Sequence, residues 1–305
     1  MAKLALITGS GGLIGSEAAR YFLDKGFEVQ GIDNNLRKYF FGEKGDTTQN
    51  VKFLEGNYSK KFSNYPLDIR DRQGVAKFFQ ERGPFDLIIH TAAQPSHDWA
   101  AKEPFTDFDV NANGTLNMLE SFRKYSPKAV FIHMSTNKVY GDNPNKLKLL
   151  ELKKRFDYAP LNEQTMPGLT IEGISEEMSL DNCTHSLFGA SKVASDVLAH
   201  EYGRYFGLNV GVFRGGCLTG PQHSAVELHG FLSYIVDCAV NGTKYNIFGY
   251  KGKQVRDQIH SFDVARAFEE FYLNPRKGEA YNLGGTKQNA ASVMEVIDIL
   301  DKDFG

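Results

Sequence analysis

The chain has 305 residues, which is long enough to bury a large core and to form one large or two modest domains. Its formal net charge is −2 and its basic residues are scattered, so it lacks the basic patch typical of nucleic-acid-binding proteins. No apolar run reaches the roughly 20 residues of a membrane helix, and the N-terminus enters a predicted strand without a signal-peptide layout. We therefore expect a cytoplasmic protein with neither nucleic-acid nor membrane partners.

The residue types that bind metals do not form a recognisable site. The three cysteines show neither metal-ligand nor disulfide spacing. Gln222, His223, Glu227 and His229 fall in one predicted loop, but their spacing is not that of a zinc motif. We expect no metal.

The segment 3–33 has the pattern strand, glycine loop, helix, strand. It reads KLALIT, then GSGGLIG, then the amphipathic SEAARYFLDKG, then FEVQGID. This order is typical of the βαβ unit that binds a dinucleotide. Gly9 permits the tight turn, Gly12 lets the backbone approach the pyrophosphate, and Gly15 lets the helix pack closely. The pyrophosphate is then expected at the positive end of the helix.

Asp33 ends the second strand of this unit. A carboxylate there can accept hydrogen bonds from the adenosine ribose hydroxyls, and it would repel a 2′-phosphate. The sequence therefore favours NAD over NADP. Arg37 weakens the preference slightly, because a guanidinium could hold a phosphate.

Strand and helix patterns continue to alternate downstream. LDIRD ends a short strand, DRQGVAKFFQERG is a predicted helix, FDLIIHTAA a buried strand, residues 108–125 a long helix and AVFIHMS another strand. Strands separated by helices predict a parallel, doubly wound α/β sheet of the Rossmann type. Ligands bind at the carboxyl ends of such strands, which here hold Asp33, Asp68, residues 92–94 and residues 135–137.

Motifs along nearly the whole chain resemble the extended short-chain dehydrogenase/reductase family of sugar-nucleotide epimerases and dehydratases. They are TGSGGLIG, LDIRD, HTAAQ, NANGT, STNKVYG, a helix carrying Lys192, GKQVRD and YNLGGT. The resemblance implies an NAD cofactor, a nucleotide-sugar substrate, and a homodimer in which helices 108–125 and 188–206 pair with their copies. The cofactor-binding residues predicted from the loop, the strand ends and the resemblance are Gly9, Gly12, Leu13, Ile14, Gly15, Asp33, Asn34, Asn35, Arg37, Asp68, Ile69, Thr91, Ala92, Ala93, Gln94, Asn111, Ser135 and Lys192.

Within the family, STNKVYGD, GKQVRD and NLGGT look most like the 2-epimerases of CDP-activated sugars. The resemblance implies oxidation to a keto sugar and return of the hydride to the other face. The 4,6-dehydratases carry an Asp-Glu pair where this chain has Asn137-Lys138, which cannot serve their elimination of water. A 4-epimerase or a dehydrogenase of a UDP- or GDP-sugar remains an alternative. The predicted substrate-binding residues are Gln94, Thr136, Asn137, Lys138 and Arg256, the last for the diphosphate.

The resemblance also shows where this chain departs from the family. Family members use a Tyr four residues before a Lys as the acid/base, and a neighbouring Ser or Thr polarises the reacting oxygen. The Lys is Lys192 and the hydroxyl is Thr136, but the Tyr position holds Phe188. Loss of a general acid/base typically costs about 10² to 10⁴ in rate. Three explanations stay open: a deliberate replacement that traps a complex, another base in the natural enzyme, or a binding relative with little turnover. Candidate replacement bases are Glu176, Glu177, Asp181, His185 and Cys217.

We expect a Rossmann domain over residues 1–185, onto which 186–214 and 255–275 pack back, and an interleaved, smaller substrate-binding region over 215–305. Residues 143–182 form a long polar connection that suits a lid, and residues 36–64 form a second one. NIFGYKGKQVRD is a predicted strand pair. Family members usually continue beyond this point, so the resemblance implies a truncated substrate region.

Overall fold

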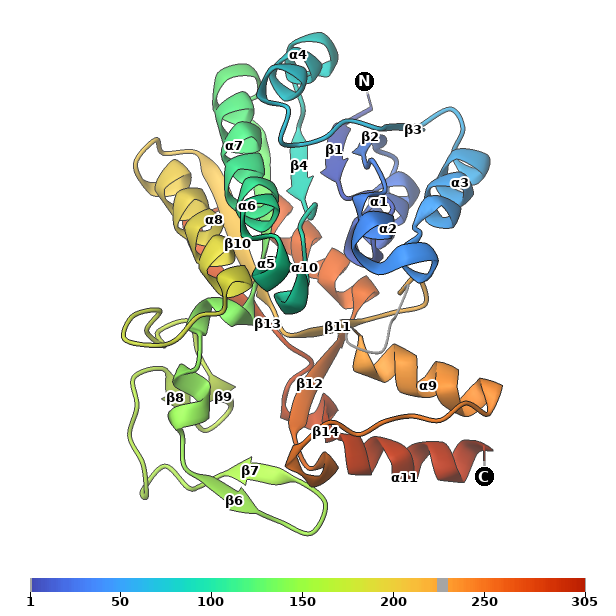
Figure 1. The fold of residues 1–305 in the computed structure, drawn as a ribbon. Helices are drawn as coiled ribbons and strands as arrows, with labels where there is room; N and C mark the ends of the chain where they lie inside the picture. The colour runs from blue at the N-terminus through green and yellow to red at the C-terminus, as the bar shows by residue number, and fades with distance from the viewer. Residues whose placement is uncertain (1, 224–229, 305) are drawn as a thin grey trace.

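A seven-stranded parallel sheet forms the centre of the larger part of the molecule (Figure 1). The computed structural model describes residues 2–223 and 230–304. Every neighbouring pair of strands is parallel. The strands lie in the spatial order β13 (Lys277–Leu283), β10 (Asn209–Gly215), β5 (Val130–Thr136), β4 (Leu87–His90), β1 (Leu4–Thr8), β2 (Glu28–Ile32) and β3 (Phe62–Tyr65). The predicted doubly wound α/β sheet is confirmed, and its order reverses between β1 and β4, where such folds bind ligands.

Helices cover both faces of this sheet, which explains its apolar strands. Side chains alternate across a strand, so Ala5 and Ile7 join one core cluster and Leu6 joins the other. The first cluster includes Phe22 and Phe268, and the helices beside it are α1 (Leu13–Asp24), α3 (Thr48–Asn57) and α10 (Ser261–Leu273). The other face is covered by α4 (Arg72–Arg82), α7 (Gly114–Tyr125) and α8 (Leu187–Arg204). No helix of the described residues is long and apolar enough to cross a membrane.

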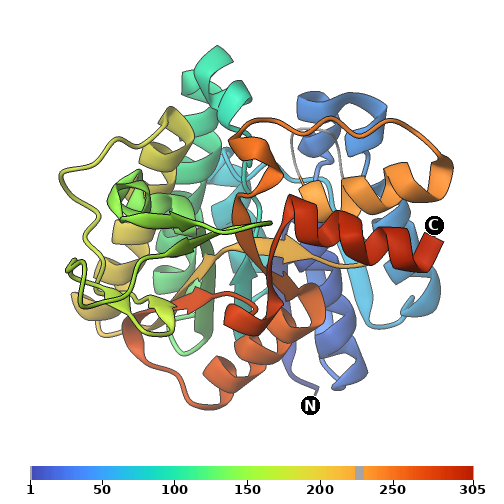
Figure 2. The same ribbon diagram turned by 90° about the horizontal axis from the view of Figure 1, so that it is seen from below.

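A smaller part, here called the small lobe, lies beyond the carboxyl ends of the large sheet (Figures 1 and 2). Lys253, just before β12, holds the hairpin of residues 149–158 in this lobe. The Lys253 carbonyl accepts from Phe156 N–H at 2.9 Å, and the Lys253 ammonium bonds Glu151 at 2.7 Å. The lobe consists of the sheet β11 (Cys217–Thr219), β12 (Val255–His260) and β14 (Ala290–Ser292), the hairpins β6–β7 (Leu149–Glu151, Phe156–Tyr158) and β8–β9 (Leu169–Thr170, Gly173–Ile174), and the helices α9 (Phe231–Asn241) and α11 (Val293–Phe304).

The structure differs from the sequence-based expectations at several boundaries. The connection 36–64 contains α2 (Leu36–Phe41), α3 and the start of β3. LDIRD lies after β3, because Pro66 cannot donate to the ladder and Asp71 instead caps α4 by accepting from Gly74 N–H. The connection 143–182 holds the two hairpins of the small lobe.

Three further elements differ from the sequence-based expectations. NIFGYKGKQVRD contributes only β12, because Gly249, Tyr250 and Lys251 have φ of 71°, 49° and 56°, which interrupts an extended chain. Residues 277–283, expected in the substrate region, form β13 of the large sheet. The predicted helix 108–125 begins earlier, with α6 (Pro104–Phe108) and a π-helical turn over Asp109–Asn113 before α7.

Candidate active site

The glycine loop after β1 is tightly constrained. Gly9 has φ of 69°, and its N–H donates to Ile32 O at 2.7 Å. A Cβ at Gly9 would lie 2.9 Å from Ala92 N, and one at Gly15 would lie 2.0 Å from Gly9 O. Side chains at these two positions would therefore force the loop apart.

The first turn of α1 presents free backbone donors to the end of the sheet. Its N-cap residue is Gly12, which provides no side-chain cap, and its first turn has no acidic residue. The amides of Leu13 and Ile14 are among the N–H groups that a helix leaves without intrahelical partners. Uncapped donors at the positive helix end suit a pyrophosphate, so the residues present fit a dinucleotide.

The Asp33 carboxylate lies directly beside this loop. Its Oδ2 accepts from Gly11 N–H at 2.8 Å and its Oδ1 accepts from Asn35 N–H at 2.7 Å. Burial raises the pKa of Asp33, and the two backbone hydrogen bonds act in the opposite direction. The carboxylate is thus fixed beyond β2, where a dinucleotide of this orientation places its adenosine ribose.

The other predicted residues on the β2 side surround this carboxylate. Asn34 Nδ2 donates to Asp68 at 3.2 Å, and Arg70 forms an ion pair with Asp68 at 2.6 Å. The Arg37 guanidinium lies 4.6 Å from the Phe41 ring centroid, and burial lowers its pKa to about 10. The Asn35 side chain bonds Asp46 and Thr47, which follow α2 in the chain. Ile69 is buried against Gly114.

Beyond β4, polar side chains hold the loop that faces the cofactor position. Thr91 Oγ1 donates to Thr8 O at 2.7 Å, and Ala92 N–H donates to Thr8 Oγ1 at 3.2 Å. Asn111, in the π-helical turn, accepts from Gln94 N–H at 2.9 Å and donates to Ser191 Oγ at 3.0 Å. Asn111 thereby joins this loop, with Ala93 in it, to α8.

The side chains of Gln94 and Ser135 are engaged inside the protein. Gln94 is 1% exposed, and its amide bonds Asp107 Oδ1 at 2.7 Å and Ser96 O at 2.8 Å. Ser135 is 4% exposed and donates to Asp196 at 2.6 Å. The contacts with a cofactor or a substrate that the sequence predicts for these two residues stay predictions. Their structural role is to support the loop after β4 and the junction of β5 with α8.

The expected catalytic residues belong to the last residues of β5 and to the first turns of α8. Lys192 is 4% exposed, and its Nζ donates to Met134 O at 3.0 Å. Burial lowers the pKa of Lys192 to about 8, although Asp196 and Asp107 act to raise it. Thr136 Oγ1 accepts from Lys138 N–H at 3.3 Å. Phe188 is 6% exposed, one helical turn before Lys192.

His97 lies against Phe188, and the sequence reasoning missed it. It is the first residue of α5 (His97–Lys102), and its ring meets the Phe188 ring edge-on with centroids 4.9 Å apart. Its Nδ1 lies 2.7 Å from Ser186 Oγ. The signal was available, because QPSHDW directly follows the HTAA end of a predicted strand.

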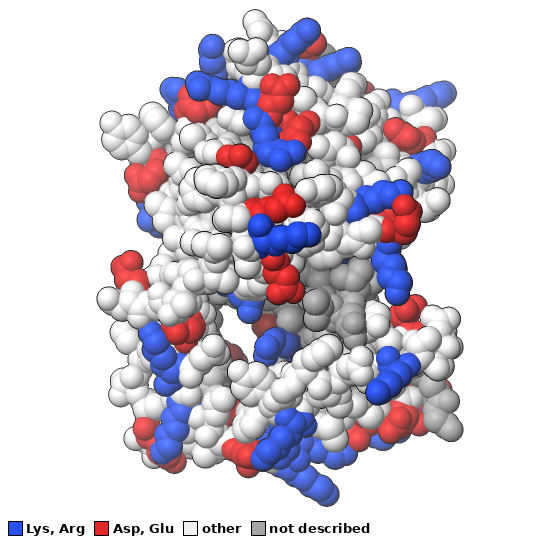
Figure 3. Space-filling model, in the orientation of Figure 1, with Lys and Arg blue, Asp and Glu red and all other residues white. Residues whose placement is uncertain are grey.

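Basic residues gather where the large sheet faces the small lobe. Figure 3 shows this face hollowed between the two parts, with basic side chains at the opening. Partial desolvation, followed by the nearby Arg256 guanidinium, lowers the pKa of Lys138. Burial raises the pKa of Tyr158 and of Cys217, and Arg256 acts to lower both. Arg256 is therefore near three side chains from different elements: Lys138 of η3 (Asn137–Tyr140), Tyr158 of β7 and Cys217 of β11.

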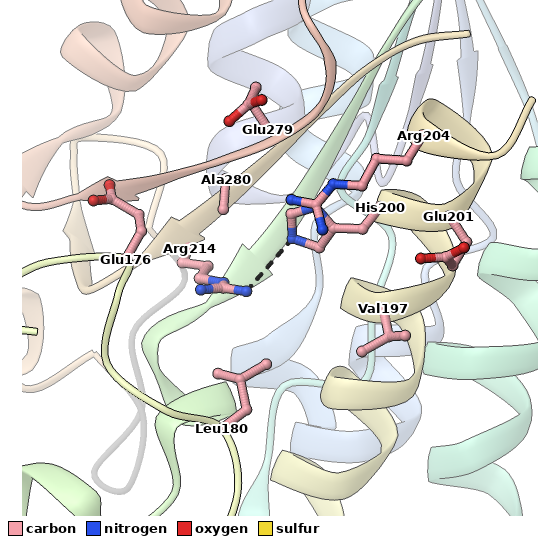
Figure 4. Close-up of a pocket in the computed structure, with 9 residues that line it drawn as sticks. All are labelled: Glu176, Leu180, Val197, His200, Glu201, Arg204, Arg214, Glu279 and Ala280. Atoms are coloured by element: carbon pink, nitrogen blue, oxygen red, sulfur yellow. Dashed lines mark hydrogen bonds between the residues drawn. The ribbon is translucent and has the colours of Figure 1, made fainter. Parts of the chain in front are cut away.

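Of the five candidate replacement bases, two are engaged, two are exposed before α8, and the fifth, Cys217 of β11, has a pKa that burial raises. Glu176 Oε1 accepts from Asn282 N–H at 2.5 Å and lines a cavity of about 360 Å³ behind α8, with Arg204, Arg214 and Glu279 (Figure 4). His185 Nε2 bonds Val139 O at 2.7 Å. Glu177 and Asp181 are exposed on the connection before α8.

Two buried histidines lie near Lys192 and are closed off from solvent. His90 bonds Thr8 Oγ1 at 2.7 Å and Thr115 Oγ1 at 3.0 Å, and burial lowers its pKa to about 3. His133 stacks on His90 at 5.5 Å and bonds Ser195 Oγ at 3.2 Å. Burial holds the pKa of His133 well below its usual value.

Within residues 2–223 and 230–304, no group of three or more His, Cys, Asp or Glu side chains is arranged to hold a metal ion. Glu227 and His229, named above with Gln222 and His223, lie outside the described residues.

The parallel sheet, the uncapped helix after its glycine loop and the carboxylate beside it define a dinucleotide-binding α/β protein. The sequence profile of the NAD dependent epimerase/dehydratase family matches residues 5–284. The chain belongs to this family, and NAD is its cofactor.

Individual relatives agree with this assignment. The chain is 33% identical over 303 residues to CDP-paratose 2-epimerase of Salmonella typhi, which covers 97% of this chain and 83% of the relative. It is 28% identical to dTDP-glucose 4,6-dehydratase of Salmonella typhimurium, covering 97% of this chain and 76% of the relative. The crystal structure of UDP-glucose 4-epimerase of Thermus thermophilus in complex with NAD is similar with a TM-score of 0.70 and 25% identity, over 98% of this chain and 82% of that chain.

Proposed function

We propose that this protein is an NAD-dependent epimerase that acts at C-2 of a CDP-activated hexose or deoxyhexose. The observation that carries the proposal is that Lys192 bonds β5 at Met134 O and that Thr136 ends the same strand, on the same edge of the sheet as the glycine loop. The substrate class is supported by the similarity to CDP-paratose 2-epimerase. Asn137 and Lys138, in place of two carboxylates, argue against elimination of water.

The residues at this edge have separate tasks in the proposed reaction. Bound NAD would accept the hydride from the sugar carbon and return it. Lys192 holds the nicotinamide ribose, and its charge favours a developing oxyanion nearby. The Thr136 hydroxyl donates to the reacting sugar oxygen, which stabilises negative charge on that oxygen.

The nucleotide part of the substrate is assigned to the small lobe. Arg256 on β12 and Lys138 after β5 supply two positive charges that are close enough to affect each other, which suits a diphosphate. We place the substrate-binding region at 215–276 and 284–305 together with the hairpins of 143–182, because these segments surround the opening. Residues 277–283 are left with the large sheet.

The test is incubation of the NAD-loaded protein with CDP-hexoses and CDP-deoxyhexoses, with products resolved by NMR. We expect interconversion of C-2 epimers without net accumulation of NADH and without solvent deuterium on the carbon skeleton. Deuterium at the epimerised carbon would instead indicate deprotonation. Inversion at C-4 of UDP- or GDP-sugars would replace the substrate assignment, and a steady change in NADH would indicate a dehydrogenase.

Phe188 favours a second candidate function, a protein that binds NAD and a nucleotide sugar with little turnover. This candidate predicts tight binding of a CDP-sugar without product after long incubation. Turnover clearly above background, unaffected by chelators, would exclude it.

A further inference from the structure

The missing hydroxyl at Phe188 leaves a defined gap in the chemistry proposed above. A group that fills it must be close to Phe188, must be accessible from the opening, and must exchange a proton near neutral pH. Glu176 and His185 are engaged elsewhere, and His90 and His133 are buried beneath Lys192. His97 is the strongest candidate, because it is exposed, its ring touches the Phe188 ring, and it is near enough to Lys138 at the opening for that ammonium to lower its pKa.

The contacts of His97 fix its ring in one orientation. Ser186 Oγ caps α8 by accepting from Gly189 N–H at 3.1 Å, and it lies 2.7 Å from His97 Nδ1. A serine oxygen has a second lone pair and can therefore also accept from Nδ1–H. In that tautomer Nε2 carries the free lone pair of a base, held by an orienting partner at the other nitrogen.

The helix that carries His97 is itself anchored. Ser96 Oγ caps α5 by accepting from Trp99 N–H at 3.3 Å, and Gln94 holds Ser96 through its side-chain amide. The Trp99 ring packs on Phe40 of α2 at 5.6 Å. A catalytic base must be held in a fixed position, and the contacts of Ser96, Gln94 and Trp99 fix the helix that carries His97.

We propose that His97 is the catalytic acid/base of this protein, acting in place of the tyrosine that Phe188 replaces; the inference rests on the proposed epimerase function. In the first half-reaction His97 Nε2 takes the proton of the sugar hydroxyl while the carbon gives its hydride to NAD, so a C–H and an O–H bond become a C=O bond. In the second half-reaction NADH returns the hydride to the other face and His97 returns the same proton. No other reactant is consumed.

The charges around His97 are compatible with this role. Partial desolvation, followed by the Lys138 ammonium, lowers the pKa of His97, and Asp98 on its own helix acts to raise it. Ser186 and Phe188 of α8 face it without charge. A lowered pKa leaves the imidazole neutral at pH 7, as a base requires.

The decisive experiment compares His97→Gln with Lys77→Gln. Glutamine at position 97 keeps a hydrogen-bonding group for Ser186 but cannot exchange a proton. We expect a loss of about 10²–10⁴ in kcat, with little change in the Kd of NAD or CDP. Lys77 is exposed on α4, where its ammonium lies 3.8 Å from Glu81, so Lys77→Gln is expected to leave kcat unchanged.

Two further measurements separate a chemical role from a structural one. Added imidazole is expected to raise the kcat of His97→Gly at least about tenfold. In the wild type, kcat/KM is expected to fall at acid pH as one group is protonated. In the wild type, ¹⁵N NMR is expected to show that the CDP-sugar shifts His97 Nε2 while CDP alone does not.

The outcomes distinguish the two proposals. Wild-type turnover with undiminished kcat in His97→Gln would overturn the role of His97 and leave the epimerase intact. A wild type that neither converts any nucleotide sugar nor reduces its bound NAD in a single turnover would overturn the proposed function. A His97 resonance that no sugar nucleotide shifts would overturn the inference independently of turnover.

Discussion

The Asp33 carboxylate is fixed by two backbone N–H groups before any cofactor arrives. This preorganisation makes Asp33→Ala a direct test of the predicted preference for NAD. We expect NAD binding to weaken by about 1–3 kcal/mol, because the ribose hydroxyls and Gly11 N–H lose their acceptor. NADP is expected to gain relative to NAD.

Titration of both cofactors against the wild type and Asp33→Ala measures the effect. Asp24→Ala is a suitable control, because Asp24 lies at the far end of α1, where it accepts from Tyr58. An unchanged ratio of NAD to NADP affinity in Asp33→Ala would show that the carboxylate does not contact the ribose.

Phe188→Tyr tests the acid/base role proposed for His97 by restoring the hydroxyl that the family has at position 188. The added hydroxyl would stand one helical turn before Lys192, whose charge lowers the pKa of a neighbouring phenol. If His97 serves as the acid/base, we expect a change in kcat of less than about tenfold in the otherwise wild-type protein. In the His97→Gln background the same substitution is expected to restore much of the lost rate.

The rate of single-turnover reduction of bound NAD is compared in the wild type, in Phe188→Tyr, in His97→Gln and in the variant that carries both substitutions. A gain of about 10² or more from Phe188→Tyr alone, abolished by Lys192→Ala, would instead establish the conventional tyrosine mechanism and a replaced residue at 188.

At the scale of elements, a buried ion pair joins α8 to β10. Arg214 donates to Asp196 at 2.8 Å and 3.1 Å and to Tyr140 Oη at 3.0 Å, and both charged residues are buried. Burial alone would raise the pKa of Asp196, but hydrogen bonds from His200 and Arg214 hold it well below its usual range. The pair therefore stabilises the fold only while the carboxylate is ionised.

Asp196→Asn is expected to lower the free energy of unfolding by about 3–5 kcal/mol at pH 7, because it leaves the Arg214 charge uncompensated. A carboxyl with a depressed folded pKa contributes stability above its unfolded pKa of about 4 and loses it as the pH falls through the folded value. The difference between wild type and variant should therefore begin to shrink below about pH 4.

Urea unfolding at pH 7 and at lower pH measures this difference. The exposed pair Asp263–Arg266 offers the control, and Asp263→Asn is expected to change stability by less than about 1 kcal/mol. Equal stabilities of Asp196→Asn and wild type at pH 7 would contradict the role given to the pair.

The helices and strands also show how much of the structure could be predicted from the sequence. The long periodic elements and the glycine loop follow from local pattern, and the structure confirms the parallel sheet that they predict. The short strands of the small lobe do not, because their pairing depends on distant partners such as Cys217 with Gln258. The hydrogen bond from the Gln94 amide to Asp107 could not be predicted either, because the HTAAQ motif carries no information about Asp107.

At the scale of the whole molecule, the candidate site is assembled from segments that are far apart in the chain. His97 and Phe188 meet only because α5 and α8 pack on the same face of the sheet. The Lys138 and Arg256 charges come near each other because the small lobe lies beyond the carboxyl ends of the strands. Sequence pattern placed the phosphate loop and Lys192, whereas the partner of Phe188 required the three-dimensional contact.

The outer surface of α8 gives a prediction for assembly. Leu187, Val197 and the C-cap residue Tyr205 are 52%, 46% and 79% exposed, with the charged Glu201 on the same side of the helix. A homodimer in which α7 and α8 pair with their copies would cover these exposed apolar side chains. We expect the protein to sediment as a dimer at micromolar concentration and Val197→Glu to weaken association by at least about tenfold, because it places a charge in the interface. Val240→Glu, at an equally apolar and 61% exposed position on α9, is expected to leave the dimer intact. A wild type that remains monomeric over this range, or equal behaviour of the two variants, would show that α8 is not the interface.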